Sequence, residues 1–363
     1  MRRPLITLFF ACLATSAIAR DLEPSAASHL RMNDLQAIGT HNSYKVAIPP
    51  AELAMIATRS EQAARALDYG HLPLKDQLDL GMRQLEIDVL YDPDGGRYAR
   101  PRLPQLSGVA YDATGMDKPG YKVLHMPDAD VRSQCATFVL CLKQVKAWSD
   151  AHPKHVPILI MMNAKDGKST VDGGTNALDY DAKAFDALDG EIRSVFGPDR
   201  LITPDDVRGN HKTLRDGVLA SGPKSGWPTL EAARGKVFFA LDEGPAKVAV
   251  YMRDHTSLEG LPVFVNSLSE TADHAAYFTM NDPAKQFARI QAAVKAGFIV
   301  RTRADDSTTE ARTNDLSRFE AALKSGAHYI STDYPTPRPE FGPYKVVLPD
   351  GAAARANPVR VKP

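Results

Sequence analysis

The chain has 363 residues, and its 44 Lys and Arg residues balance its 44 Asp and Glu residues. This balance argues against bulk electrostatic binding to nucleic acid or to an anionic membrane, so any recognition of phosphate must be local. We therefore expect no nucleic-acid partner. The length is compatible with one large α/β domain or with two smaller domains.

The N-terminal segment has the pattern of a secretory signal peptide. Arg2 and Arg3 give a charged start, Leu5 to Leu13 form an apolar run, and small residues precede a cleavage position after Ala19. The apolar run is too short to cross a bilayer, which takes about 20 apolar residues. We predict that residues 1–19 are removed and that the mature protein is exported, either to the periplasm or out of the cell.

Two cysteines remain once the signal peptide is removed. Cys135 and Cys141 lie six positions apart, and an exported chain with one even pair favours a short-loop disulfide. The alternative is two buried free thiols on a helix, although a spacing of six is awkward for one helical face. The disulfide would brace the loop that follows His125.

Short apolar runs alternate along the chain with longer amphipathic segments, as in a parallel sheet built from βα units. Candidate strands cover residues 35–40, 84–90, 122–125, 157–163, 236–241, 262–266, 298–303 and 329–332, with a weaker one at 200–203. Candidate helices cover residues 60–67, 74–80, 138–152, 180–196, 204–207, 213–221, 283–296 and 309–325.

The number of strand and helix pairs is close to eight, which favours a closed (β/α)8 TIM barrel over an open doubly wound sheet. No glycine-rich dinucleotide fingerprint follows the first candidate strand to support the open sheet. We expect one barrel domain over residues 20–335 and a Pro-rich, extended tail over residues 336–363.

Polar residues gather at the C-terminal ends of the candidate strands, where barrel enzymes place their active sites. They are His41 and Asn42 after the first strand, Glu86 and Asp88 in the second, His125, Asn163, Lys165, and Arg301 with Arg303 in a late strand. The sequence therefore predicts one polar pocket built from several strands.

Glu86 and Asp88 are two apart in a strand and so point to the same face. Two close carboxylates repel each other unless a proton or a cation lies between them. With carboxamide oxygens from Asn42 and Asn163, the site would contain only oxygen ligands, which suits Ca²⁺ or Mg²⁺ better than Zn²⁺. The alternative is that both acids form salt bridges with Arg301 and Arg303.

His41 and His125 are candidates for acid-base catalysis, because histidine can both accept and donate a proton near neutral pH. A histidine that is merely hydrogen-bonded at the barrel mouth is the simpler interpretation for either one alone. A zinc site would need a third nitrogen or sulfur ligand, and the sequence offers none beside them.

Three motifs resemble the X-region of phosphoinositide-specific phospholipase C: Thr40-His41-Asn42-Ser43-Tyr44, Leu85-Glu86-Ile87-Asp88 and Val123-Leu124-His125. The chain more closely resembles the bacterial and fungal calcium-dependent branch of that family, which Val300-Arg301-Thr302-Arg303-Ala304-Asp305 and Ser331-Thr332-Asp333-Tyr334-Pro335 also fit. The motifs occur in the family's order, and the likeness runs from about Leu35 to Pro335.

The resemblance implies that His41 and His125 are the catalytic histidines and that Asn42, Glu86 and Asp88 bind Ca²⁺. Where eukaryotic relatives have a glutamate as the fourth ligand, this chain has Asn163. This neutral ligand would weaken calcium binding or move the role of general base to Glu86.

By the same resemblance, Lys165 and Arg301 face the substrate phosphate, and Arg303 is a further candidate. Lys165 could instead be solvated in its loop, and Arg303 could serve only to orient Asp88.

The implied reaction is attack on phosphorus by a hydroxyl of the substrate's own alcohol group, which gives a cyclic phosphodiester and releases the other alcohol. The implied substrate is an inositol phospholipid, met by a monomer in peripheral contact with the membrane. Two alternatives are a glycerophosphodiester or sphingomyelin phosphodiesterase on the same barrel, and a calcium-dependent binding protein without activity.

Overall fold

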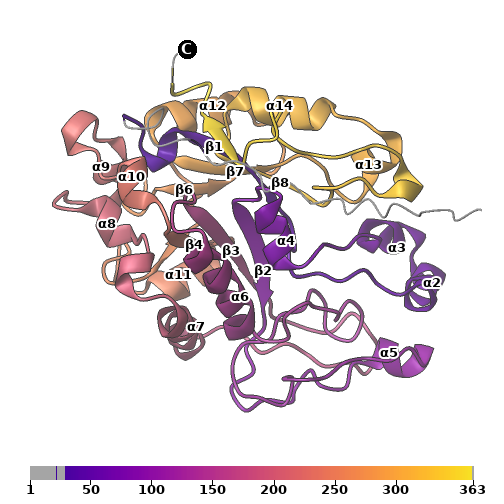
Figure 1. Cartoon of the computed structure of the whole chain (residues 1–363). Helices are drawn as coiled ribbons and strands as arrows, with labels where there is room; N and C mark the ends of the chain where they lie inside the picture. Colours follow the sequence, from indigo (N-terminus) through magenta and orange to yellow (C-terminus); the bar gives the residue numbers. More distant parts are fainter. Residues whose placement is uncertain (1–21, 23–28, 362–363) are drawn as a thin grey trace, which may run out of the picture.

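The computed structural model describes residue 22 and residues 29–361, which form a nearly closed barrel of parallel strands wrapped by helices (Figure 1). The predicted signal peptide lies outside the described residues. The barrel strands are β1 (Leu35–Thr40), β2 (Gln84–Val89), β3 (Ile158–Ala164), β4 (Val237–Leu241), β5 (Val263–Val265), β6 (Tyr277–Thr279), β7 (Ile299–Arg303) and β8 (Tyr329–Thr332).

The strands pair in chain order, and β8 returns to pair with β1 over four residue pairs. Between β5 and β6 the contact is a single parallel bridge from Asn266 to Tyr277. This arrangement confirms the predicted (β/α)8 TIM barrel.

The helices lie between and around the strands. They are α2 (Pro50–Arg59), α3 (Glu61–Leu67), α4 (Leu74–Asp79), α5 (Arg102–Ser107), α6 (Phe138–Ala151), α7 (Ala182–Val195), α8 (Pro204–Arg208), α9 (Leu214–Leu219), α10 (Leu230–Ala233), α11 (Pro245–Met252), α12 (Phe287–Ala296), α13 (Thr309–Thr313) and α14 (Ser317–Ser325). Short 3₁₀ turns are η1 (Met32–Asp34), η2 (Pro198–Arg200), η3 (Gly222–Lys224) and η4 (Pro339–Phe341). None of the described helices is long and apolar enough to cross a bilayer.

Alternation along β2 explains how one strand serves both the core and the barrel interior. Leu85, Ile87 and Val89 belong to the main hydrophobic cluster, which also contains residues of α4 and α6. Because successive strand residues point to opposite faces, Glu86 and Asp88 share the other face, inside the barrel. The carboxylates therefore enter the barrel as a consequence of packing the apolar residues outward.

The first two strands approach each other closely at Gly39, which pairs with Gln84. A Cβ at Gly39 would lie 2.4 Å from Oε1 of Gln84, so any larger residue would push β2 away from β1. The glycine thus sets the separation of the strands that carry His41 and Glu86.

The predicted strand at 122–125 is wrong, because Lys122 pairs only through isolated antiparallel bridges to Leu90 and Thr137. The segment belongs to the long connection between β2 and β3, so His125 lies in a loop and not at the end of a barrel strand. β2 and β3 pair directly, and the eighth barrel strand is β6, between β5 and β7, whose three residues are too short a run to be recognised from the sequence.

Two helix predictions also change. The helix expected over 283–296 begins only at Phe287, after a turn in which Gln286 N–H donates to Asp282. The helix expected over 309–325 is broken at Asn314, whose φ of 51° is left-handed and ends α13 before α14 starts. Gly297 and Gly326 end their helices in the left-handed conformation.

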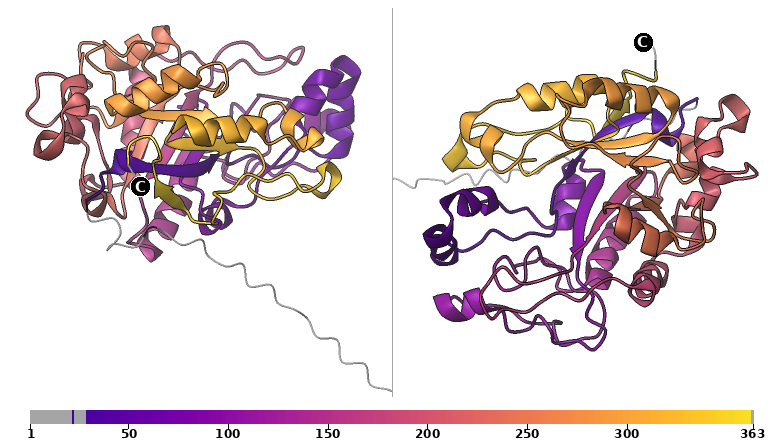
Figure 2. Two further views of the ribbon diagram at one scale, coloured as in Figure 1. Left: turned by 90° about the horizontal axis from the view of Figure 1, so that it is seen from above. Right: turned by 180° about the vertical axis from the view of Figure 1, so that it is seen from behind.

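The C-terminal segment packs back onto the barrel. Tyr344, Val346 and Leu348 are buried, and β9 (Ala354–Ala356) pairs antiparallel with the first half of β1. Figure 2 shows this end of the chain beside β1. The first half of β1 has room for β9 because β2 pairs with β1 only at Gly39.

The disulfide between Cys135 and Cys141 is present and confirms the prediction. Cys141 lies in the first turn of α6, so the bond ties the loop after His125 to the start of that helix. Both cysteines are buried.

Replacing both cysteines by alanine should lower the free energy of unfolding by about 2 kcal/mol, because a closed loop of this length restricts the unfolded chain by roughly that amount. Urea denaturation of the wild type and of Cys135→Ala/Cys141→Ala measures the difference. Reductant should lower the stability of the wild type and leave the double variant unchanged; an equal response of both proteins would contradict the assignment.

Candidate active site

The polar residues predicted from the strand ends do converge at the mouth of the barrel. β1, β2, β3 and β7 meet around Glu86, which is buried at 4% exposure. Its Oε2 lies 2.6 Å from Nη2 of Arg301, and its Oε1 accepts a hydrogen bond of 3.0 Å from Nδ2 of Asn163. Nε2 of His41 lies 3.7 Å from the same Oε1.

Asp88 forms the second half of the carboxylate pair. Its Oδ2 lies 3.1 Å from Nζ of Lys165 and accepts a hydrogen bond of 2.9 Å from the hydroxyl of Tyr44. Burial lowers the pKa of Lys165, but the attraction of Asp88 outweighs burial and raises the pKa overall, so Lys165 stays charged. The lysine is therefore held against Asp88 and is not free in its loop.

The alternative in which Arg301 and Arg303 neutralise the two acids is only half realised. Arg301 does pair with Glu86, but Asp88 pairs with Lys165. Arg303 lies against Asp306 and Asp333 and does not orient Asp88.

Two buried oxygens at this site have no hydrogen-bond partner, Oδ1 of Asn42 and Oδ1 of Asp88. Asn42 has a left-handed φ of 47°, and its Nδ2 donates to the hydroxyl of Tyr69, which leaves the carbonyl oxygen unsatisfied. A buried polar atom without a partner is costly, and a hard cation would satisfy both oxygens. The residues therefore fit Ca²⁺.

The donor set explains the type of metal. Within the described part of the chain, no group of three or more His, Cys, Asp or Glu side chains could hold a metal. A cation at Asp88 and Glu86 would need carboxamide oxygens as well, which Asn42 and Asn163 can offer. Oxygen ligands of this kind suit Ca²⁺ and not Zn²⁺.

His41 is fixed by a buried carboxylate at the end of β8. Its Nδ1 lies 2.8 Å from Oδ1 of Asp333, and its ring stacks on Tyr69 with 5.8 Å between centroids. With Nδ1 turned to Asp333, Nε2 points toward Glu86. Burial, followed by the charge of Arg303, lowers the pKa of His41 well below its usual value.

Asp333 in turn belongs to a buried pair of acids. The backbone N–H of Asp333 donates to Oδ1 of Asp305. Nη2 of Arg303 lies 3.4 Å from Oδ2 of Asp333, the carboxylate oxygen that does not face His41. Burial and the neighbouring Asp333 raise the pKa of Asp305 to about 7. Arg303 therefore balances the charge of Asp333, which explains why Arg303 faces this pair.

His125 has an equivalent carboxylate partner of its own. Its Nδ1 lies 2.9 Å from Oδ2 of Asp130, and a backbone bond from His125 N–H to the Asp130 carbonyl closes the turn between them. Asp130 also lies 3.0 Å from Nζ of Lys45, which in turn lies 4.9 Å from the centroid of the Tyr69 ring that stacks on His41, so a chain of contacts joins the two histidines.

Four residues of this site were not recognised from the sequence: Lys45, Tyr69, Asp130 and Asp333. Asp333 follows the last strand directly, so its position at a strand end was a usable signal. Lys45, Tyr69 and Asp130 lie in loops, and no local pattern indicates that loops 24 or more residues apart will meet.

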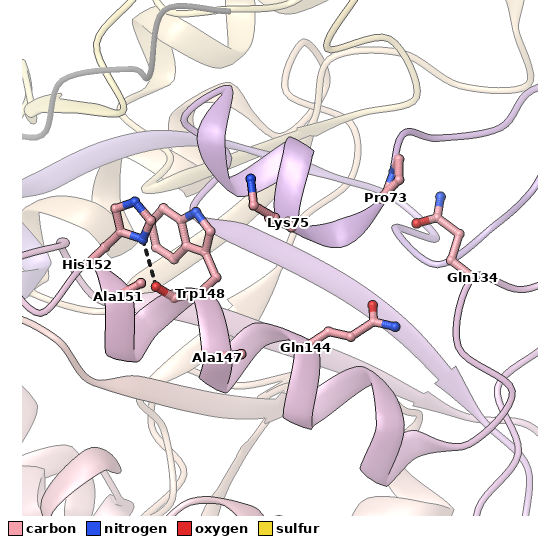
Figure 3. Close-up of a pocket in the computed structure, with 8 residues that line it drawn as sticks. All are labelled: Pro73, Lys75, Gln134, Gln144, Ala147, Trp148, Ala151 and His152. Atoms are coloured by element: carbon pink, nitrogen blue, oxygen red, sulfur yellow. Dashed lines mark hydrogen bonds between the residues drawn. The ribbon is translucent and has the colours of Figure 1, made fainter.

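One cavity adjoins this site, and another lies away from it. A cavity of about 480 Å³ lies beside His41 and is lined by Tyr69, His71, Asp333 and Tyr334 among others. Another of about 510 Å³ lies outside the barrel between α4 and α6 and contains no predicted site residue (Figure 3). There Trp148 stacks on His152 at 4.2 Å between centroids, so these rings pack against each other.

The barrel mouth thus holds His41 beside a cluster of carboxylates and carboxamides, and this is the end of the barrel where TIM-barrel enzymes place their active sites. The family model of Ca²⁺-dependent phosphoinositide phospholipase C matches residues 30–358. The chain belongs to this family and is a calcium-dependent phosphodiesterase. A comparison with curated proteins finds no match.

Solved structures agree on the fold. A calcium-dependent phosphoinositol-specific phospholipase C from Pseudomonas sp. superposes with a TM-score of 0.58 at 19% identity, covering 94% of this chain and 99% of that chain. The calcium-dependent phosphatidylinositol-specific phospholipase C of Streptomyces antibioticus gives a TM-score of 0.53 at 18% identity, covering 89% and 100%. A myoinositol complex of the Pseudomonas enzyme gives 0.58 at 18% identity, covering 94% of this chain and 99% of that chain.

Calcium should raise the melting temperature of the wild type relative to a sample with chelator, since a ligand that binds only the folded state stabilises it by about 2.7 kcal/mol at 100 times its Kd. Asn42→Ala and Asp88→Asn should reduce or abolish this shift, because the first removes an unsatisfied oxygen and the second removes the negative charge of a ligand. Differential scanning fluorimetry measures the shift, with the exposed Asn210→Ala as control. A full calcium shift in Asn42→Ala would contradict the site.

Proposed function

We propose that the enzyme cleaves an inositol phospholipid by attack of the substrate's own hydroxyl on phosphorus, with His41 and His125 as the catalytic histidines. The observation that supports this most is that each imidazole has Nδ1 beside a buried carboxylate, His41 at 2.8 Å from Asp333 and His125 at 2.9 Å from Asp130. Two oriented imidazoles can serve the opposite sides of one phosphodiester.

Asn42, Glu86, Asp88 and Asn163 are the residues that would hold Ca²⁺. Bound there, Ca²⁺ would stabilise charge that builds on the phosphoryl oxygens and lower the pKa of a coordinated hydroxyl. Asn163 donates its Nδ2 to Glu86, so its carbonyl oxygen is the atom left to face a cation. Its neutrality lowers the negative charge of the site relative to a glutamate.

Proton transfer is divided between the two sides of the pocket. Glu86 accepts the proton of the attacking hydroxyl as the O–P bond forms. His125 donates the proton on Nε2 to the leaving oxygen as the other P–O bond breaks, while Asp130 keeps the proton on Nδ1. The negative charge of the bound phosphodiester favours the protonated form of His41, which then donates through Nε2 to a non-bridging oxygen while Asp333 accepts from Nδ1. The products are a cyclic phosphodiester and a free alcohol.

The cations of the rim bind the phosphate group. Lys165 and Arg301 flank the two carboxylates from β3 and β7, where a phosphate entering the mouth would meet them. Arg303 acts mainly through Asp333 and His41, because its guanidinium lies 3.3 Å from Nδ1 of His41. Holding the nucleophile in line supplies much of the rate through proximity.

The N-terminal segment and the lipid substrate indicate the compartment of the enzyme and its contact with the membrane. The signal peptide at residues 1–19 exports the mature chain to the periplasm or the medium. The barrel domain of residues 20–335 and the tail of 336–363 act as a monomer that touches the membrane only peripherally.

Phosphorus NMR tests the reaction. Phosphatidylinositol mixed with the purified enzyme and Ca²⁺ should give a cyclic inositol phosphate, and chelator should stop its formation. Release of phosphocholine from sphingomyelin, or of glycerol phosphate from a glycerophosphodiester, without a cyclic product would replace this proposal by the related phosphodiesterase reaction.

His41→Ala and His125→Ala should each lower kcat by at least about 100-fold, the usual contribution of acid-base catalysis. His29→Ala, an exposed histidine away from the barrel mouth, should leave the rate unchanged. Circular dichroism and melting temperatures establish that the variants are folded. Near-normal turnover by either folded alanine variant would refute the assignment.

A further inference from the structure

Lys45 is a lysine with no exposed side-chain surface, and it lies between the two histidines. Its Nζ is 3.0 Å from both carboxylate oxygens of Asp130. On its other side, Nζ lies 4.9 Å from the centroid of the Tyr69 ring. A buried lysine is expensive unless it is paired, so its presence here calls for a physical reason.

On one side, Lys45 sets the charge state of the carboxylate that holds His125. Burial raises the pKa of Asp130, but the attraction of Lys45 and the hydrogen bond from His125 outweigh burial, and the pKa is lowered overall. An ionised Asp130 can accept the Nδ1 proton of His125, which fixes the orientation and tautomer of the ring.

On the other side, Lys45 supports the ring that packs against His41. Tyr69 stacks on His41, and its hydroxyl lies 3.3 Å from Nδ1 of that histidine. The same hydroxyl accepts a hydrogen bond of 2.8 Å from Nδ2 of Asn42. Lys45 thus places one buried charge against a partner of each histidine, Asp130 for His125 and Tyr69 for His41.

The backbone at Lys45 is tied to two neighbouring loops. The carbonyl of Lys45 accepts from His71 N–H, and Val46 N–H donates to the carbonyl of Arg132. A bridge between Lys45 and Ser133 joins the turn after β1 to the loop that carries Asp130. The lysine is therefore built into the junction of two loops and is not a surface residue that happens to be covered.

We propose that Lys45 is a positioning residue for the reaction: as the buried counter-ion of Asp130, it keeps that carboxylate ionised so that His125 presents Nε2 to the leaving oxygen. This inference rests on the proposed role of His125 as the general acid. Lys45 touches neither the substrate nor the reacting atoms, so it acts only through Asp130 and the ring of Tyr69.

Loss of Lys45 has a defined chemical consequence. Without the counter-ion, the buried carboxyl of Asp130 takes up a proton, because burial alone disfavours the charged form. A protonated carboxyl no longer accepts the Nδ1 proton strongly, and the imidazole loses the anchor that aims its proton at the leaving oxygen. Substrate binding changes little, since the phosphate is held by other groups.

Lys45→Met should lower kcat by about 10- to 100-fold, the usual effect of removing a partner that orients a site residue. KM should change by less than about 3-fold. Asp130→Asn should show a similar loss of kcat. In the double variant Lys45→Met/Asp130→Asn, the second substitution should lower kcat by less than a further factor of about 3, because both substitutions break the same chain of contacts.

The double variant also keeps the test valid if Lys45→Met unfolds. An asparagine at position 130 needs no counter-ion, so the double variant should melt higher than Lys45→Met while staying as inactive as Asp130→Asn. Lys146→Met, which removes a surface lysine paired with Asp150, serves as the control and should leave both rate and stability unchanged.

A spectroscopic measurement separates this role from general stability. The Nδ1 proton that His125 shares with Asp130 should give a downfield imidazole resonance in proton NMR, assigned by its absence in His125→Ala. Lys45→Met should remove or shift this resonance, and Lys146→Met should not.

Three results would overturn the proposal: Lys45→Met with normal kcat, rate losses that multiply in the double variant, or an unchanged imidazole resonance in folded Lys45→Met. If instead the wild type hydrolyses no inositol phospholipid, the proposed function fails. The resonance and the melting temperatures would still report whether Lys45 governs the Asp130–His125 pair.

Discussion

The structure depends on a rule of charge balance: every ionised side chain buried in the barrel mouth must meet an opposite charge, because water cannot solvate it there. Glu86 meets Arg301, Asp88 meets Lys165, Asp333 meets Arg303, and Asp130 meets Lys45. Each pair joins residues far apart in the chain, so the balance can be reached only in the folded barrel. Two oxygens left unsatisfied inside this balanced set mark where a cation belongs.

The barrel brings these charges together through ordinary packing. Apolar residues of β2 face the surrounding helices, which turns Glu86 and Asp88 inward, and Gly39 allows β1 to come close enough for His41 to reach Glu86. The long excursion after β2 returns His125 to the same mouth, and the disulfide between Cys135 and Cys141 fixes the end of that excursion. The geometry of the site thus depends on a loop as much as on strands.

Membership of the calcium-dependent phosphoinositide phospholipase C family gives this arrangement its chemical meaning, and Asn163 shows how a neutral side chain fits into it. The carboxamide of Asn163 donates to Glu86, which a glutamate at this position could not do without a proton. A glutamate would also add a third negative charge beside Glu86 and Asp88 and so increase their mutual repulsion. The neutral side chain therefore helps to hold Glu86 in place without adding charge.

The sequence by itself determined what is local: the alternation that makes a βα barrel, the cysteine pair, and the polar residues that directly follow or lie within strands, such as His41, Glu86, Asp88 and Arg301. Only the tertiary structure decided what depends on contacts between distant segments. It placed His125 in a loop, supplied β6 from three residues, and chose Asp130, Asp333 and Lys45 as partners of the site. The physical reason is that strand periodicity is set by neighbours along the chain, whereas the pairing of buried charges is set by which loops the closed barrel brings together.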